Sequence, residues 1–302
     1  MKQNLTQNRT LSILPILAYI SVSFSWGTTY LAIKIAVTVF PPGLFAGIRF
    51  LIAGAILLLF ARIKNIKFPD NYKQYLKNAF PGILIICGSN GIVMYISKWV
   101  DSGIISVFIA SIPLFIALLE TVDRRENVLR LSGWFGLIMS FIGVVFIARA
   151  GSDIGNIDLK GIVWVMIAVI MGAVGSVSSR KMTSGPVVVT AGIQMFTAGL
   201  IMFIIGTLLG EFSQVSISSK AVWAMLYLIF IGSLMGYGCF VYLLSIWSPT
   251  RVSTISYVNT VIALLLGVII LKESISLTSV ISTFVILLGV IVVQASKKTV
   301  KK

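Results

Sequence analysis

Residues 46–54 read AGIRFLIAG, and residues 191–199 read AGIQMFTAG, with five of nine positions identical. Further residues match at nearly the same separation, among them Tyr95 with Tyr242 and Gly143 with Gly289. The chain therefore contains an internal repeat. Each copy is predicted to hold five apolar segments, and because five is odd, the second copy crosses a membrane in the opposite direction. Inverted repeats of this kind surround the mid-membrane site of many secondary transporters.

Composition places the chain in a membrane. Of its 302 residues, 58% are hydrophobic and only 11% are charged, whereas soluble domains are about 45–50% apolar. So few charges cannot cover a soluble surface, while lipid requires none. The prediction is one all-α integral membrane domain, since transmembrane helices satisfy their own backbone hydrogen bonds.

Ten apolar segments are long enough to cross a bilayer, which takes about 17–25 residues each. They are residues 13–37, 42–61, 79–99, 102–119, 132–148, 161–179, 187–209, 221–245, 252–271 and 276–294. The predicted organisation is a cytoplasmic N-terminal tail (1–12), a first five-helix repeat (13–149), a linker (150–160), a second five-helix repeat (161–296) and a basic cytoplasmic tail (297–302).

The basic residues predict orientation. The formal charge is +15, from 24 Lys and Arg against 9 Asp and Glu. With ten spans and both termini in the cytoplasm, most Lys and Arg residues fall in cytoplasmic loops, as the positive-inside rule requires. We therefore predict a multi-pass protein of the cell (cytoplasmic) membrane. Nucleic acid is excluded as a partner, because the cations occupy short loops between apolar segments.

The sequence gives little support for a catalytic site or a metal site. The chain has no histidine, and its two cysteines, Cys87 and Cys239, lie in apolar segments at non-equivalent repeat positions. We predict no metal, no cofactor and no enzyme activity. All acidic residues fall in loops or at segment ends, so the sequence offers no obvious proton carrier at mid-membrane, and Glu120 is the least remote candidate.

Polar and aromatic residues inside the apolar segments are the candidate substrate ligands. In the first segment, Trp26 and Tyr30 share one helical face, because they are four residues apart. Such a face lines either a water-filled cavity or a contact between helices. The candidate substrate-binding residues are Trp26, Tyr30, Arg49, Asn90, Tyr95, Ser176, Tyr237, Tyr257 and Asn259.

Arg49 lies about a third of the way into the second segment. A charge there costs about 2.5–3.5 kcal/mol even on insertion scales, so it must face protein or water. In a functional role, Arg49 anchors an anionic, carboxylate-bearing substrate or acts as a gate residue. In a structural role, it is a partner of helix-end carbonyls, of Asp101 or of Glu211. Its repeat mate, Gln194, is uncharged. Pro113, inside the fourth segment, predicts a kink or gate.

Residues 26–34 (WGTTYLAIK), followed by Pro41, Pro42 and residues 46–50 (AGIRF), resemble the opening of EamA-type permeases of the drug/metabolite transporter superfamily. Residues 98–103 (KWVDSG) and 271–273 (LKE) resemble two later junctions of that family. The resemblance implies ten helices in two inverted repeats around a central cavity. It also implies transport of small metabolites, often the export of amino acids and sometimes of drugs.

These observations predict a secondary transporter that exports small metabolites, amino acids or related polar compounds, by alternating access. The alternative is a multidrug exporter of the same fold, whose aromatic residues would bind cations through their ring faces; Arg49 opposes this. A passive channel is a further possibility. The expected partners are membrane lipid and a small-molecule substrate, and the sequence leaves both a monomer and a homodimer open.

Overall fold

The computed structural model describes residues 13–36, 40–96, 99–100, 105, 108–122, 129–151, 159–216, 218–271 and 277–296. These residues form ten helical spans and no strand. The spans of the first repeat are α1 (Ile13–Ala36), α2 (Pro42–Ile63), α3–η1–α4 (Tyr72–Gly82, Ile83–Gly91, Ile92–Ile96), a fourth span that ends in α6 (Ile112–Val122), and α7 (Leu131–Gly151). Those of the second repeat are α8 (Leu159–Met182), α9 (Val187–Leu208), α10–η3–α11 (Ser219–Tyr227, Leu228–Tyr237, Gly238–Ile246), α12–α13 (Pro249–Ser253, Ile255–Leu271) and α14 (Leu277–Ala295).

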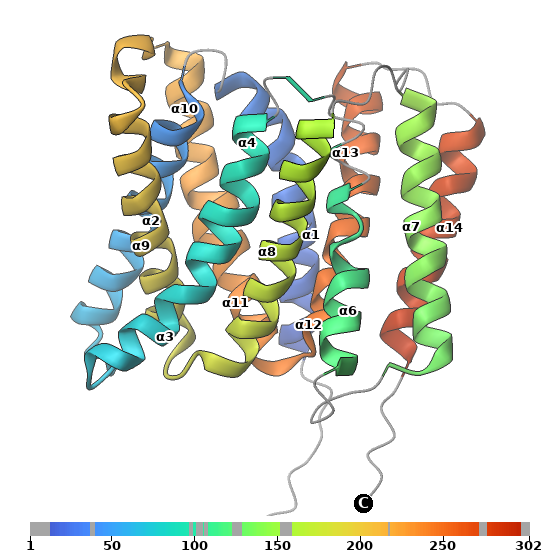
Figure 1. The fold of residues 1–302 in the computed structure, drawn as a ribbon, viewed down its shortest axis with the longest axis horizontal. Helices are drawn as coiled ribbons and strands as arrows, with labels where there is room; N and C mark the ends of the chain where they lie inside the picture. Colours follow the sequence, from blue (N-terminus) through green and yellow to red (C-terminus); the bar gives the residue numbers. More distant parts are fainter. Residues whose placement is uncertain are drawn as a thin grey trace, which may run out of the picture.

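The two repeats cross the molecule in opposite directions. In Figure 1, α1 begins at the lower edge and rises, whereas its repeat mate α8 begins at the upper edge and descends. The last helix, α14, ends at the lower edge where α1 begins. Among the described residues, five helices are by themselves long and apolar enough to cross a membrane, and shorter apolar helices accompany them. The predicted fold of ten transmembrane helices in two inverted repeats is confirmed.

The repeated stretches of the sequence pack against each other. Glycines let the backbones of α2 and α9 approach each other closely. A Cβ atom on Gly47 would lie 2.6 Å from the Cα of Phe203, and Cβ atoms on Gly54 and Gly199 would meet the backbone of Phe196 and Leu51. Small residues permit such close contact between membrane helices. The α2–α9 pair therefore joins the two repeats along much of its length.

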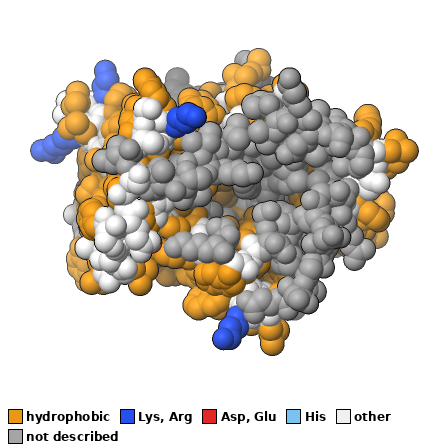
Figure 2. All heavy atoms as spheres, turned by 90° about the horizontal axis from the view of Figure 1, so that it is seen from above, with side chains coloured by type: hydrophobic (Ala, Val, Ile, Leu, Met, Phe, Trp, Pro, Cys, Tyr) orange, Lys and Arg blue, Asp and Glu red, His pale blue; other side chains and the backbone are white. Residues whose placement is uncertain are grey.

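A second pair, α7 and α14, lies at the opposite side of the molecule (Figure 1). Ser140 Oγ of α7 donates to the Ile286 carbonyl of α14 at 3.1 Å. The outer faces of the pair carry exposed apolar side chains, such as Phe135 and Phe284. Seen from above in Figure 2, hydrophobic side chains form much of the rim of the described part. This rim is the surface that lipid would cover.

Two predicted segments differ in detail from the structure. The third span begins at Tyr72, seven residues before the predicted start, because the Asn71 side chain accepts a hydrogen bond from Gln74 N at 3.0 Å and caps a polar first turn. In the fourth span, a turn at Ala110 and Ser111 precedes α6, so Pro113 lies in the first helical turn. Proline is tolerated there, since the first N–H groups of a helix have no partner within the helix.

The structure also contains two π-helical segments, which the sequence analysis did not predict. η1 covers Ile83–Gly91 and η3 covers Leu228–Tyr237, so their first residues are 145 positions apart and their last residues 146. They are therefore repeat mates. η3 occupies the centre of the span Ser219–Ile246, at mid-membrane depth. π-helical turns are rare and occur frequently at functional sites.

Candidate substrate site

Side chains from three other spans form hydrogen bonds with η3. From α1, Ser25 Oγ donates to the Ile231 carbonyl at 2.6 Å, and Trp26 Nε1 donates to the Gly232 carbonyl at 3.1 Å. Arg49 of α2 bonds to Ser233 of η3, and Gln194 of α9 bonds to Tyr237 of η3. These polar groups meet in the membrane interior, where an unsatisfied polar group is costly. The η3 segment is therefore a point at which polar side chains of several helices meet.

Arg49 of α2 is the buried cation of this region, with 7% of its surface exposed. Its Nε donates to Ser233 Oγ of η3 at 2.8 Å, and its guanidinium carbon lies 4.8 Å from the centre of the Phe50 ring. The absence of a side chain at Gly232 makes room for it, because a Cβ atom there would lie 2.6 Å from Arg49 Nη2. No carboxylate of a described residue forms an ion pair with Arg49.

The buried carboxylates of the described part are engaged elsewhere. Glu211 accepts hydrogen bonds from Leu44 N at 2.7 Å, Gly43 N at 3.3 Å and the Tyr95 hydroxyl at 3.0 Å. It therefore caps the N-terminus of α2, where the helix dipole favours an anion. The expected alternative of a Glu211–Arg49 pair is not formed, and Asp101 lies outside the described residues.

Glu120 makes the corresponding contact at the other end of the molecule. It is buried in the last turn of α6 and accepts hydrogen bonds from Thr250 N at 2.8 Å and from the Thr250 hydroxyl. It thereby caps α12 and ties the fourth span to the ninth. In the described residues, the remaining acid is Asp70, which pairs with Lys67 at 3.3 Å on the exposed surface.

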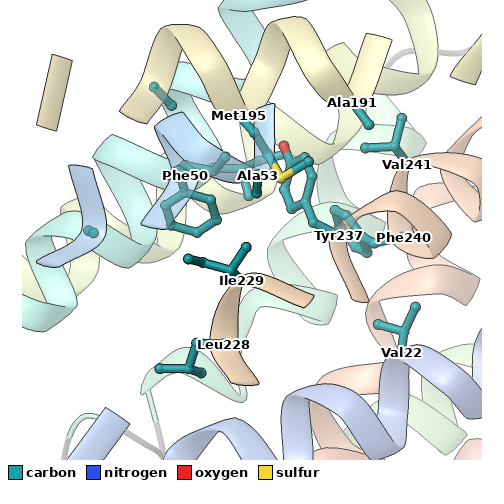
Figure 3. Close-up of a cluster of buried hydrophobic side chains, with 14 of the residues drawn as sticks. Val22, Phe50, Ala53, Ala191, Met195, Leu228, Ile229, Tyr237, Phe240 and Val241 are labelled. Carbon is teal, nitrogen blue, oxygen red and sulfur yellow. The ribbon is translucent and has the colours of Figure 1, made fainter. Parts of the chain in front are cut away.

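Gln194 of α9, the repeat mate of Arg49, also binds η3. Its Oε1 accepts a hydrogen bond from the Tyr237 hydroxyl at 2.9 Å. Tyr237 is only 2% exposed. Figure 3 shows it between Met195 and Phe240, with Phe50 beyond. Two equivalent helices, α2 and α9, thus hold the same π segment through one charged and one neutral side chain.

Aromatic rings continue the site toward α1. The Trp26 ring lies 5.0 Å from that of Phe240, centre to centre, and Tyr237 lies 5.9 Å from Phe240. Trp26 is half-buried. Its nitrogen is already bonded to Gly232, so its ring face and edge are what it can offer a ligand.

Asn90 lies in η1, the repeat mate of η3, and its side chain is exposed. Residues three and four positions away on the same helical face, Cys87 and Met94, pack against the main buried cluster. Cys87 Sγ also donates to the Ala198 carbonyl of α9 at 3.2 Å. Asn90 thus lies between two residues that are partly buried against that cluster, while its own side chain is exposed.

Four predicted site residues form contacts away from η3. The Tyr257 hydroxyl donates to the Leu137 carbonyl of α7 at 3.3 Å, and Ser176 Oγ donates to Gly172 of its own helix at 2.8 Å. The Asn259 amide, oriented so that its nitrogen donates, bonds to the carbonyls of Ser23 at 2.9 Å and Ile255 at 3.1 Å. Tyr95 is held by Glu211, as described above.

The contacts of Tyr257, Asn259 and Tyr95 join different helices, whereas that of Ser176 stays within α8. The side chain of Tyr30 lies outside the described residues. Of the predicted set, Trp26, Arg49 and Tyr237 meet at η3, and Asn90 lies on its repeat mate. The sequence analysis did not select Ser233, although a serine beside Gly232 at mid-span was a usable signal. It gave Gln194 only as the uncharged mate of Arg49.

Within the described residues, no group of three His, Cys, Asp or Glu side chains could hold a metal ion.

Comparison with known proteins identifies the family. Residues 13–149 and residues 159–294 each match the EamA-like transporter family. The chain is 30% identical over 287 residues to YedA, an inner membrane transporter of Escherichia coli strain K12, an alignment that covers 94% of this chain and 92% of YedA. It is 26% identical over 285 residues to a WAT1-related chloroplastic protein of Arabidopsis thaliana, covering 91% of this chain and 68% of that protein.

A solved crystal structure shares the fold. It superposes with a TM-score of 0.78 at 20% sequence identity, over 92% of this chain and 95% of the other. The two family matches together span nearly the whole chain, and each covers one five-helix repeat of the structure. The protein is therefore an integral membrane transporter that belongs to the EamA-like transporter family.

Proposed function

We propose that this transporter carries small metabolites that bear a carboxylate, with amino acids as the leading class. The observation that carries the proposal is Arg49, a buried cation bonded to the neutral hydroxyl of Ser233 at 2.8 Å. A guanidinium binds a carboxylate through two parallel N–H donors, and the strength of that contact increases away from water. Asn90 and the Trp26 ring supply further polar and apolar contacts for a small solute.

We further propose alternating access as the mechanism. Inverted repeats around a mid-membrane site allow one half to move against the other. The α2–α9 pair is closely packed, which suits a fixed axis. In contrast, Glu120 and Thr250 join the fourth and ninth spans by hydrogen bonds at the lower end, which suits a closed gate on that side. The proposed repeats are residues 13–149 and 161–296, joined by a linker at 150–160.

For the orientation, we propose that both termini lie in the cytoplasm and that transport is directed outward across the cell membrane. The Lys and Arg residues of the loops support this orientation, and YedA is named as an inner membrane transporter. A reporter that is active only in the cytoplasm, fused after residue 302, should be active. Activity of an external reporter at the same place would contradict the orientation.

The main alternative substrate is a lipophilic cation. The Phe240 ring lies 5.0 Å from that of Trp26 and 5.9 Å from that of Tyr237, and such aromatic rings would favour a cationic solute. Arg49 would repel it. Efflux of a cationic dye from cells therefore separates the two classes: dye efflux that survives Arg49→Gln would favour the drug-exporter alternative.

The proposal is tested by flux from proteoliposomes loaded with a panel of amino acids and other metabolites, with and without an imposed pH gradient. Loss of carboxylate-bearing solutes, abolished by Arg49→Gln and kept by Ser176→Ala, is the expected result. Ser176 is the matched control because, within the described residues, its hydroxyl donates to the Gly172 carbonyl of its own helix. Equal loss from liposomes with and without folded protein would contradict the proposal.

A further inference from the structure

The Arg49 guanidinium needs a counter-charge throughout the transport cycle. A carboxylate substrate supplies one only while it is bound. Before binding and after release, the cation would remain in the membrane interior, where an uncompensated charge is costly. What balances Arg49 in the substrate-free transporter is therefore a physical question that the proposed function leaves open.

The described residues contain no carboxylate that could do this. Glu211 is bonded to the N-terminus of α2, Glu120 to Thr250, and Asp70 to Lys67 on the surface. Ser233 offers only a neutral oxygen. The Phe50 ring, 4.8 Å from the guanidinium carbon, gives a partial and weak compensation.

The geometry around the guanidinium leaves donors for a small anion. Of its nitrogen atoms, Nε is bonded to Ser233, while Nη1 and Nη2 form no hydrogen bond with a described residue. Nη2 itself lies against Gly232, in the place that a side chain would take there, so an anion must approach the guanidinium from another direction. Because 7% of Arg49 remains exposed, the residue is not sealed off. Two parallel N–H groups of one guanidinium can bind a single spherical anion as well as a carboxylate.

We propose that a small inorganic anion, of which chloride is the test case, binds Arg49 in the substrate-free transporter and is displaced by the carboxylate of the substrate. This inference rests on the proposed function in taking Arg49 as the substrate anchor. Its consequence is competition: chloride stabilises the empty protein and weakens the apparent affinity for a carboxylate substrate.

The first experiment needs no substrate. Purified protein is titrated with sodium chloride against sodium methanesulfonate at constant ionic strength, and thermal unfolding is followed. We expect the midpoint of the wild-type protein to rise by about 3 °C or more at saturating chloride. Arg49→Gln should show no rise. No chloride-dependent rise in the wild type, or the same rise in Arg49→Gln, would overturn the proposal.

Arg251→Gln is the matched control. Arg251 is also a partly buried arginine without a described carboxylate partner, since its Nε donates to Gln294 at 3.1 Å and its guanidinium lies over the Trp247 ring at 4.6 Å. Its loss should leave the chloride-dependent rise unchanged. A rise abolished by Arg251→Gln but not by Arg49→Gln would place the anion elsewhere and overturn the proposal.

A second measurement uses only the wild-type protein and decides the matter if Arg49→Gln does not fold. The half-saturating concentration of a transported carboxylate is measured with and without chloride. It should rise in proportion to chloride, and an unchanged value would overturn the proposal. A failure of the proposed function gives a different result. If chloride raises the unfolding midpoint in a way that requires Arg49, but the protein transports no carboxylate, the anion site is supported and the proposed substrate class is contradicted.

Discussion

The two π-helical segments occupy equivalent positions in the repeats but have different surroundings. η3 is bonded by Ser25, Trp26 and Arg49 from two other helices, and its own Tyr237 is bonded to α9. η1 packs through glycines against methionine side chains of α8 and α9 and leaves Asn90 exposed. The repeat thus conserves a backbone geometry while its polar chemistry is concentrated in one copy.

This difference has a consequence for binding. In a symmetric site, each π segment would offer a solute the same groups. Here η3 presents a cation held against it, and η1 presents a neutral amide. This asymmetry agrees with the proposed substrate class, because an amino acid also has one anionic end and one different polar end.

The largest expected effect comes from adding a methyl group to η3. In Gly232→Ala, the new Cβ would lie 2.6 Å from Arg49 Nη2 and 2.9 Å from Thr29 Cγ2, so the guanidinium must leave its place. We expect carboxylate flux to fall about thirtyfold, because a hydrogen bond to a charged group contributes about 1.5–3 kcal/mol and the anchor also moves. Flux in proteoliposomes at matched protein abundance checks this.

The matched change in η1 is Gly88→Ala. Its Cβ would meet the end of the flexible Met171 side chain, which can move aside at small cost. We expect flux within about threefold of wild type. Equal losses from Gly88→Ala and Gly232→Ala would mean that the two segments do not differ in function.

A smaller effect is expected from Ser233→Ala, which removes the hydrogen-bond acceptor of Arg49 Nε without adding bulk. We expect the half-saturating carboxylate concentration to rise about tenfold, because the guanidinium loses its fixed orientation and binds the carboxylate less tightly. The control is Ser89→Ala in η1, whose side chain packs beside Gly172 and whose loss should change the value less than twofold. If Ser89→Ala instead had the larger effect, the carboxylate anchor would lie at η1 and not at η3.

The smallest effect on stability is expected at Asn90. Because its side chain is exposed, Asn90→Ala should change the unfolding free energy by less than about 0.5 kcal/mol. It should nevertheless alter the order of preference among amino acids in a competition assay. An unaltered order, in protein of normal abundance, would remove Asn90 from the site.

The sequence was sufficient for the fold because its signals are local and numerous. Apolar length predicts each span, the repeat of AGIRFLIAG and AGIQMFTAG predicts their arrangement, and those two stretches proved to be in contact. The charge of Arg49 was enough to predict that it faces protein or water inside the membrane. Each of these inferences depends on composition or periodicity within one segment.

The π segments and the roles of individual polar residues could not be predicted in this way. Each π segment contains a glycine against which a side chain of the other repeat packs, Met171 at Gly88 and Arg49 at Gly232, and such contacts are not visible within one segment of the sequence. Tyr257 is as polar as Tyr237, yet its hydroxyl bonds to α7 instead of α9. The Asn259 amide bonds to backbone carbonyls, whereas Asn90 is exposed. Which face of a helix meets a cavity depends on the positions of all its neighbours, which no single segment specifies.

The most direct test of the central claim compares an amino acid with the amine that lacks its carboxylate. Both are offered to proteoliposomes that contain either the wild-type protein or Arg49→Gln. The account predicts that the wild-type protein carries the amino acid at least about tenfold better than the amine, and that Arg49→Gln loses this preference. The same preference in both proteins, or none in the wild type, would contradict the claim that Arg49 on η3 binds the carboxylate.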